Sequence, residues 1–263
     1  GQGGPWPGQS LTMGRRLLPV CVGVLLALAG CNGEEAGCWT SLGDPTTQVV
    51  SLGSPIETVH ILDRVNVEWS PAPGPDGPQL IWTAGEGVIG GMSSEVNNGI
   101  LQIQDLNTCR WVRPLHAIPQ LRIEGLACRD WLLEGQGTFT MVDTLIGGDL
   151  KFTGDEMSGP ASLLFHGDTL QVRMPNGIGH VEARGTARRI RAFRAGFGDL
   201  NARDLDVRQA MIHHGGLGEV RLNASDYVYL EVAGPGHTYL YGGAEDANIQ
   251  FLDGATGTVT DVP

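Results

Sequence analysis

The histidines of the C-terminal half are the first residues whose types and spacing could do chemistry. His213 and His214, together with His237 or His180, could supply imidazole ligands to a metal ion. Adjacent residues of a strand face opposite sides, so at most one of the adjacent pair could join a given site. No carboxylate or cysteine lies at a recognisable ligand spacing, and a turn before residues 215–216 explains the pair equally well. We therefore expect no metal site and no other cofactor.

A second group of interest is the pair of carboxylates in Asp204-Leu205-Asp206, which share one side of a predicted strand. Paired carboxylates about 5 to 10 Å apart would suit glycoside hydrolysis. Leu205 and Val207 define the inward side of that strand, however, and this leaves both aspartates facing solvent. We expect them to be solvated charges that blunt a sheet edge rather than catalytic acids.

Nucleotide and nucleophile motifs are missing from the sequence. The glycine-rich run at residues 85–91 resembles a phosphate-binding loop, but it lacks the Lys-Ser/Thr pair and no helical pattern follows it. There is no G-x-S-x-G elbow and no Cys/His dyad with a third orienting group. The sequence predicts no catalytic residues and a protein that is not an enzyme.

Cys31 is a different kind of reactive residue, because of what precedes it. Met13 is followed by Gly14-Arg15-Arg16 and by an apolar run over residues 17–30, which together have the layout of a signal peptide. The run is shorter than the roughly 20 residues of a permanent membrane span. Residues 28–31 (LAGC) resemble the bacterial lipobox, in which a peptidase cuts before a lipidated cysteine. An ordinary secretory signal with a chance cysteine is the alternative.

These features divide the chain into four predicted parts. Residues 1–12 are an upstream extension of the reading frame, 13–30 a lipoprotein signal peptide, 31–45 a lipidated flexible tether, and 46–263 a folded domain. Several acyl chains on Cys31 would hold the protein stably on a membrane, since each buried methylene contributes about 0.8 kcal/mol. We expect an exported protein anchored in the bacterial cell envelope, at the outer membrane, on its periplasmic or surface side.

The charge balance limits the possible partners. The chain has 17 basic and 29 acidic residues, a formal net charge of −12. Binding to nucleic acid needs a basic footprint, so we expect no nucleic-acid partner. On the same argument, acidic sugars and anionic lipid faces should be repelled unless calcium intervenes.

Three further cysteines follow Cys31, and an exported location permits a disulfide between two of them. Cys38 lies in a glycine-rich start and Cys109 in a turn-like Asn-Thr-Cys, so a Cys38–Cys109 bridge would pin the N-terminus to the body. Closing this loop would stabilise the fold by about 4 kcal/mol. Cys128 would then be a buried small hydrophobic residue.

A repeat in the C-terminal half predicts the architecture. Glycine doublets stand at positions 177/179, 196/198 and 216/218, with a weaker copy at 236, and short alternating strands follow them. A period near 20 with strands and no helices favours an all-β fold, a right-handed parallel β-helix or β-solenoid of about seven coils. We expect Gly179, Gly198 and Gly218 to be structural glycines with positive φ at the coil corners. A β-sandwich is the alternative.

The order of these motifs resembles the putative auto-transporter adhesin, head GIN domain family. The resemblance rests on Val65-Asn66-Val67, on residues 95–103 (EVNNGILQI) and on residues 196–207 (GFGDLNARDLDV), and it extends over roughly residues 45 to 255. A cysteine with an aromatic neighbour at Cys38 and an Asn-x-Cys ending at Cys109 match some family members approximately. The sequence departs from the pattern at Thr238 and in the arginine-rich stretch 184–194.

The resemblance implies a right-handed β-helical fold and an exported lipoprotein, while fold alone does not assign function. We expect a non-enzymatic, lipid-anchored solenoid that presents an extended surface to a glycan or protein of the cell envelope. The alternatives are a carbohydrate-active β-helix enzyme, a hydrolase or lyase, and a purely structural envelope protein. Exposed aromatics such as Tyr227, Tyr229 and Tyr241 would favour the binding role.

Overall fold

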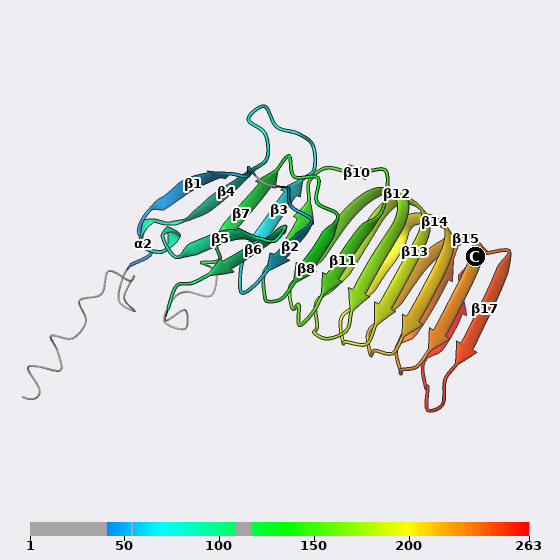
Figure 1. The fold of residues 1–263 in the computed structure, drawn as a ribbon. Coiled ribbons are helices and arrows are strands. Elements are labelled where there is room, and N and C mark those ends of the chain that lie inside the picture. Colours follow the sequence, from blue (N-terminus) through cyan, green and yellow to red (C-terminus); the bar gives the residue numbers. More distant parts are fainter. Residues whose placement is uncertain (1–40, 54, 109–116, 263) are drawn as a thin grey trace, which may run out of the picture.

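The computed structural model describes residues 41–53, 55–108 and 117–262. Strands stacked side by side form one long body, with the N-terminal strands at one end and the C-terminal strands at the other (Figure 1). The strands are β1 (Pro45–Ser51), β2 (Thr58–Ile61), β3 (Asn66–Ser70), β4 (Gln79–Gly85), β5 (Met92–Asn97), β6 (Ile100–Asp105), β7 (Gln120–Glu124), β8 (Asp130–Leu133), β9 (Phe139–Met141), β10 (Leu145–Ile146), β11 (Leu150–Gly154), β12 (Ala161–Met174), β13 (Val181–Arg194), β14 (Leu200–His214), β15 (Val220–Val232), β16 (His237–Tyr241), β17 (Asp246–Phe251) and β18 (Thr258–Asp261). A short helix, α2 (Glu86–Ile89), follows β4.

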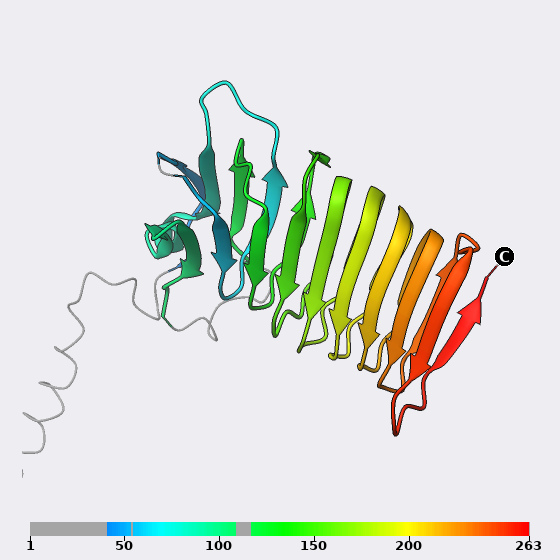
Figure 2. The ribbon, with the colours of Figure 1, turned by 45° about the vertical axis from the view of Figure 1, so that its right-hand side comes forward.

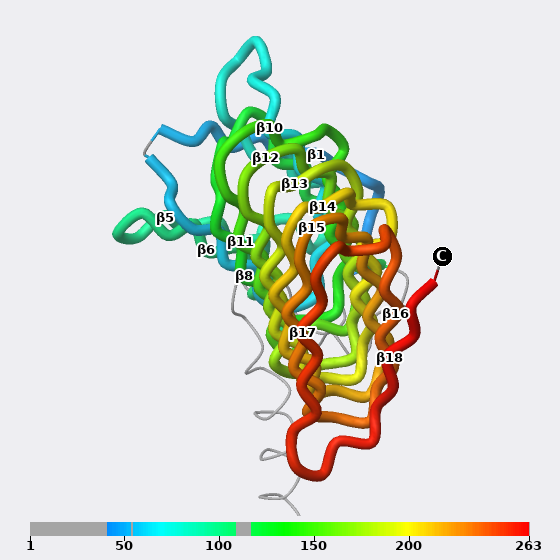
Figure 3. The backbone as a smooth tube through the Cα atoms, turned by 90° about the vertical axis from the view of Figure 1, so that its right-hand side faces the viewer, coloured from blue at the N-terminus to red at the C-terminus, as the bar shows by residue number. Residues whose placement is uncertain are grey.

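The predicted solenoid is confirmed. Strands β12 to β15 are 13 to 15 residues long and pair in parallel, with Ala161 opposite Val181 and Val181 opposite Leu200. Each strand bends around a corner, so that its two halves lie on opposite sides of a flattened coil, as the view along the stack shows (Figure 3). Successive coils are stacked along the body (Figure 2).

The coils create two broad sheet faces. Face A consists of β6, β2, β8, β11, the second halves of β12 to β15, and β17. Face B consists of β7, β3, β9, the first halves of β12 to β15, β16 and β18. Inward and outward residues alternate along each strand, so every second side chain is displayed on a face.

The N-terminal end departs from the purely parallel pattern. There β4 pairs antiparallel with both β1 and β7, and β5 pairs antiparallel with β6. A terminal coil has no preceding coil to satisfy its backbone, and added antiparallel strands supply those hydrogen bonds. The glycine repeat does not extend into this region, so the sequence pattern could not reveal the antiparallel pairs.

Large aromatic side chains fill the N-terminal part of the core. The ring centroids of Trp69 and Trp131 are 4.4 Å apart, and Phe139 lies 5.0 Å from Trp131 and 5.4 Å from Phe152. The indole N–H of Trp69 donates to the carbonyl of Leu126 at 2.9 Å, so this buried polar group is satisfied. Toward the C-terminus the ladders are of smaller residues, such as Ala210 and Val228.

The predicted reason for the structural glycines is wrong. Gly179, Gly198 and Gly218 do not have positive φ, whereas Gly177, the first glycine of the first doublet, does (φ +94°). What excludes a side chain is the preceding coil: a Cβ added to Gly198 would lie 1.6 Å from the carbonyl oxygen of Gly179. A Cβ on Gly218 would lie 2.5 Å from the carbonyl oxygen of Gly198, and one on Gly179 would lie 2.7 Å from that of Gly159.

Cys128 is buried, as expected for a small hydrophobic residue. Its thiol lies 3.2 Å from the carbonyl oxygen of Glu57, and burial raises its pKa. Cys31, Cys38 and Cys109 lie outside the described residues, so the lipid anchor and the Cys38–Cys109 bridge stay predictions. Within the described ranges, no helix has the length and apolar character needed to cross a bilayer.

Candidate functional site

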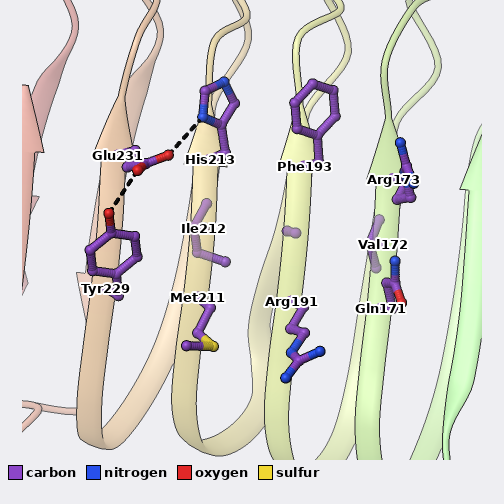
Figure 4. A pocket seen from close by; sticks show the side chains of 11 residues that line it. Gln171, Val172, Arg173, Arg191, Phe193, Met211, Ile212, His213, Tyr229 and Glu231 are labelled. Carbon is purple, nitrogen blue, oxygen red and sulfur yellow. Dashed lines mark hydrogen bonds and ion pairs between the residues drawn. The ribbon is translucent and has the colours of Figure 1, made fainter. Parts of the chain in front are cut away.

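The outward side chains of face A align across β12 to β15. In two neighbouring rows, Arg173 is opposite Phe193, which is opposite His213, and Gln171 is opposite Arg191, which is opposite Met211. The rows end on β15, where His213 is opposite Glu231 and Met211 is opposite Tyr229. These eight residues, which we call the outer patch, line a hollow of about 470 Å³ together with Val172, Ala192 and Ile212 (Figure 4).

The first row is a continuous chain of contacts. The Arg173 guanidinium lies 5.9 Å from the ring centroid of Phe193, and the Phe193 and His213 rings stack at 5.0 Å with an interplanar angle of 8°. His213 Nδ1 lies 3.0 Å from Glu231 Oε2, and the Tyr229 hydroxyl donates to Glu231 Oε1 at 2.7 Å (Figure 4). These contacts hold an aromatic platform next to a fixed carboxylate.

The two ends of the outer patch carry opposite charge. The hydrogen bond from Tyr229 and then that from His213 lower the pKa of Glu231, which is therefore a carboxylate at neutral pH, and Glu231 in turn raises the pKa of Tyr229. At the other end Arg173 and Arg191 are exposed. Neither guanidinium has a hydrogen bond or ion pair with another described residue. The patch thus offers cations, an aromatic ring and hydrogen-bond acceptors in that order.

Face B carries a second hollow, of about 490 Å³, that includes Glu182, Asp199, Asn201 and Arg221. Its arginine is already occupied, because Arg221 pairs with Glu219 and lies 5.7 Å from the ring centroid of Tyr239. This makes the outer patch on face A the better candidate for a binding site.

The structure separates the histidines considered as metal ligands. His213 and His214 face opposite sides, as predicted: His213 lies in the outer patch and His214 is completely buried. His180 lies 3.2 Å from Asp199 on face B, and His237 contacts Thr258 at 2.5 Å on the same face. Residues 41–53, 55–108 and 117–262 contain no cluster of three or more His, Cys, Asp or Glu side chains that could hold a metal ion.

His214 and Arg194 form a buried polar pair that the sequence did not reveal. Arg194 Nη1 lies 2.9 Å from His214 Nε2, and His214 Nδ1 lies 2.9 Å from the Thr238 hydroxyl. Burial, and then the neighbouring Arg194, lower the pKa of His214 to about 4, so the imidazole is neutral. Burial lowers the pKa of Arg194 to about 10, and its Nε and Nη2 have no hydrogen-bond partner among the described residues.

The predicted orientation of Asp204 and Asp206 is confirmed. Both are exposed, whereas Leu205 and Val207 are buried. Asp206 accepts a hydrogen bond from Asn223 at 2.7 Å and so adds to the contacts between coils.

The tyrosines expected to be exposed are each about half-buried. Tyr227 and Tyr229 lie on face A, while Tyr241 ends β16 on face B and lies beneath the Arg203 guanidinium at 4.9 Å. Among these three, only Tyr229 belongs to the outer patch. The other aromatic residue of the patch is Phe193. The repeat period of about 20 residues leads from Arg173 to Phe193 and from Phe193 to His213, so the sequence alone could have placed these three residues in one row.

The chain has clear relatives in sequence and fold. The sequence profile of the putative auto-transporter adhesin, head GIN domain family matches residues 73–244. A putative adhesin from Bacteroides fragilis superposes with a TM-score of 0.73 at 16% identity, covering 83% of this chain and 97% of that one. A putative adhesin from Parabacteroides distasonis gives a TM-score of 0.57 at 17% identity, covering 84% and 98%.

A further protein of Parabacteroides distasonis, described as a putative lipid binding protein, gives a TM-score of 0.56 at 18% identity and covers 84% of this chain and 98% of that one. No curated protein sequence matches this chain. Identities this low show a shared fold and leave the ligand to be argued from the residues themselves.

Proposed function

The chain belongs to the putative auto-transporter adhesin, head GIN domain family, and from that membership we propose that it is a non-enzymatic binding protein of the cell envelope that contacts its ligand through the outer patch. The observation that carries this proposal is the row Arg173–Phe193–His213–Glu231, in which four consecutive coils each place one side chain of a different chemical type on the same open face. Such a surface can hold a ligand that extends across several coils.

The geometry favours binding over catalysis. Glu231 is the carboxylate of the outer patch, and hydrolysis of a glycosidic bond by the common mechanism needs two carboxylates facing one bond. The Asp204 and Asp206 side chains are exposed to solvent and lie outside the residues that line the patch.

Binding through the outer patch can be tested with a matched pair of phenylalanine variants. Phe193→Ala removes the platform of the patch, while Phe197→Ala removes an equally large side chain that is 62% exposed in a turn outside it. We expect Phe193→Ala to weaken binding of the purified domain to a glycan array or to bacterial cells by about 10-fold or more, since aromatic anchors contribute most to such interfaces. Equal losses in the two variants would refute the assignment of the patch.

We further propose that the protein is held on a membrane by lipid attached to Cys31; the signal-peptide layout of residues 13–30 and the lipobox-like residues 28–31 support this proposal. A tether before the solenoid would let face A reach partners away from the membrane surface. In metabolic labelling with a fatty-acid analogue, the wild type should acquire label and Cys31→Ala should not. Label retained by the variant would refute the anchor without affecting the binding role of the patch.

A further inference from the structure

Positive charge is concentrated on β12 to β15, although the chain as a whole is negatively charged. Although the formal net charge is −12, nine of its arginines lie between residues 173 and 221, on β12 to β15. Charges farther away than about 8 Å are largely screened at physiological ionic strength. A ligand at the outer patch therefore experiences the charges of the patch, and the expectation that acidic sugars are repelled does not apply there.

Several of these arginines are already neutralised or held by neighbours. Arg188 pairs with Asp168 at 2.5 Å and Arg208 pairs with Asp226 at 2.8 Å. In the same way, Glu182 accepts from Arg184 and Gln209 accepts from Arg189. By contrast, Arg173 and Arg191 of the outer patch are left with their donors exposed and free among the described residues.

The two free arginines stand close enough on face A for both exposed side chains to reach one anion, although their guanidiniums point to opposite ends of the strands in Figure 4. Arg191 is opposite Gln171, two residues before Arg173, so the Cα atoms of the two arginines are diagonal neighbours about 8 Å apart. A guanidinium binds a carboxylate with two parallel hydrogen bonds, a geometry that lysine cannot offer. The cationic end of the patch is thus suited to a carboxylate group.

The rest of the patch is suited to a sugar ring. Phe193 is held between His213 and Arg173 and presents the exposed edge of its apolar ring, while Met211 on the next strand is 41% exposed. Glu231 accepts hydrogen bonds from Tyr229 and His213, and a carboxylate has about four acceptor positions, so it can also accept from ligand hydroxyls. A carboxylate that accepts from hydroxyls next to an aromatic platform is a combination that recognises polyols rather than purely apolar ligands.

The location within the sheet argues against a peptide ligand. Peptides that bind to sheets do so by adding a strand to a free edge, where backbone groups are unpaired. The outer patch lies on β12 to β15, and each of these strands is paired on both sides. Only side chains are available on this face, so recognition has to come from their charges and rings.

We propose that the outer patch binds a saccharide that carries a carboxylate, with the acid group at Arg173 and Arg191, the sugar ring against the exposed edge of Phe193, and hydroxyls at Glu231 and Tyr229. This inference rests on the proposed binding function and narrows its ligand to acidic glycans. It requires no calcium, because the protein itself supplies the cations.

Calorimetric titration with trigalacturonate and with the neutral galactotriose tests this proposal. We expect the acidic trisaccharide to bind at least 10-fold more tightly, equally well in the presence of EDTA, and more weakly as salt is raised. Arg191→Gln and Arg173→Gln should each reduce that preference by about 10-fold. Arg188→Gln, which removes an arginine already paired with Asp168, should change it little.

The other outcomes separate this inference from the proposed function. Equal binding of the two trisaccharides, abolished by Phe193→Ala, would overturn the acidic ligand and leave the binding role of the patch standing. Equally tight binding of a polyglutamate peptide would overturn the saccharide. If neither trisaccharide binds while cells or arrayed glycans still do, in a manner that depends on Phe193, the carboxylate proposal fails and the binding function survives. If Phe193→Ala has no effect in any of these assays, both proposals fail.

Discussion

At the scale of single residues, the buried Arg194–His214 pair shows how one position can depend on the whole stack. Arg194 is completely buried, and Asp199, whose negative charge acts to raise the pKa of Arg194, forms its ion pair with His180 instead. A neutral His214 can accept a hydrogen bond from Arg194 through Nε2, whereas a protonated His214 would place two positive charges in contact. Neutral imidazole is therefore part of the folded state.

This pair predicts a pH dependence of stability. The pKa of His214 is about 4 in the folded protein against 6.5 for an ordinary histidine, so below pH 6.5 the unfolded chain binds a proton that the folded chain does not. The stabilising contribution is complete above pH 6.5 and is lost as the pH falls toward 4. We expect this one group to reduce the free energy of unfolding by about 2 to 3 kcal/mol between pH 7.5 and 4.5.

Urea unfolding of the wild type and of His214→Gln at both pH values measures this effect. Carboxylates that titrate over the same pH range change the free energy of unfolding of both proteins alike. The difference between the two proteins in how this free energy changes with pH therefore reports His214 alone. Parallel slopes would show that His214 does not titrate in this way.

At the scale of the elements, the corners between coils are where stacking is least tolerant. The backbones of consecutive corners approach so closely that an added Cβ on Gly198 would overlap the carbonyl of Gly179. A backbone atom cannot rotate away as a side chain can, so both coils would have to shift. The second glycine of each doublet marks a contact between coils rather than a special backbone conformation.

Alanine variants at these glycines test that explanation. We expect Gly198→Ala to destabilise the protein by about 2 to 4 kcal/mol, lowering the melting temperature by about 5 to 15 °C. Gly74→Ala is the control, because its added Cβ would meet only the Glu124 carboxylate, at 3.8 Å, and it should change the melting temperature by about 1 °C or less. Similar melting temperatures for the two variants would show that the corners are looser than the close approach implies.

At the scale of the whole molecule, the two ends of the solenoid differ. Antiparallel β1, β4 and β5 cover the N-terminal coils, whereas β17 and β18 each pair with preceding coils only, among the described residues. All six residues of β17 are exposed. They include Ile249 and Phe251, which are opposite the buried residues Leu230 and Val232 of β15. The acidic side chains at this end, Asp246, Asp253 and Asp261, disfavour pairing with another copy of the chain.

This asymmetry predicts how the molecule opens. Coils are stabilised mainly by their nearest neighbours, so a coil with a neighbour on one side should open at lower free energy than one with two. In native-state hydrogen exchange, we expect the amides of β17 and β18 to exchange at least 100-fold faster than the amides of β13 and β14. Uniform protection along the stack would show instead that the solenoid opens as a single cooperative unit.

The sequence by itself determined the stacking of coils and much of the face that carries the candidate site. Glycine doublets recur at a nearly constant interval, and strands with alternating apolar residues lie between them. These strands can bury their inward side chains only against the coils before and after. The same period places Arg173, Phe193 and His213 in one row. The directions of His213, His214, Asp204 and Asp206 followed from simple alternation along a strand.

Only the tertiary structure decided which residues of that face are available and why the glycines are required. Glu231 comes two positions earlier than the repeat would place it, because the pairing of β14 with β15 shifts register between Ala202 and Asp206 and again before Gln209. Asp168 and Asp226 pair with Arg188 and Arg208, while Arg191 has no hydrogen bond or ion pair with a described residue. Contacts between side chains on neighbouring coils depend on these local shifts and on actual distances, and a repeat in the sequence specifies neither.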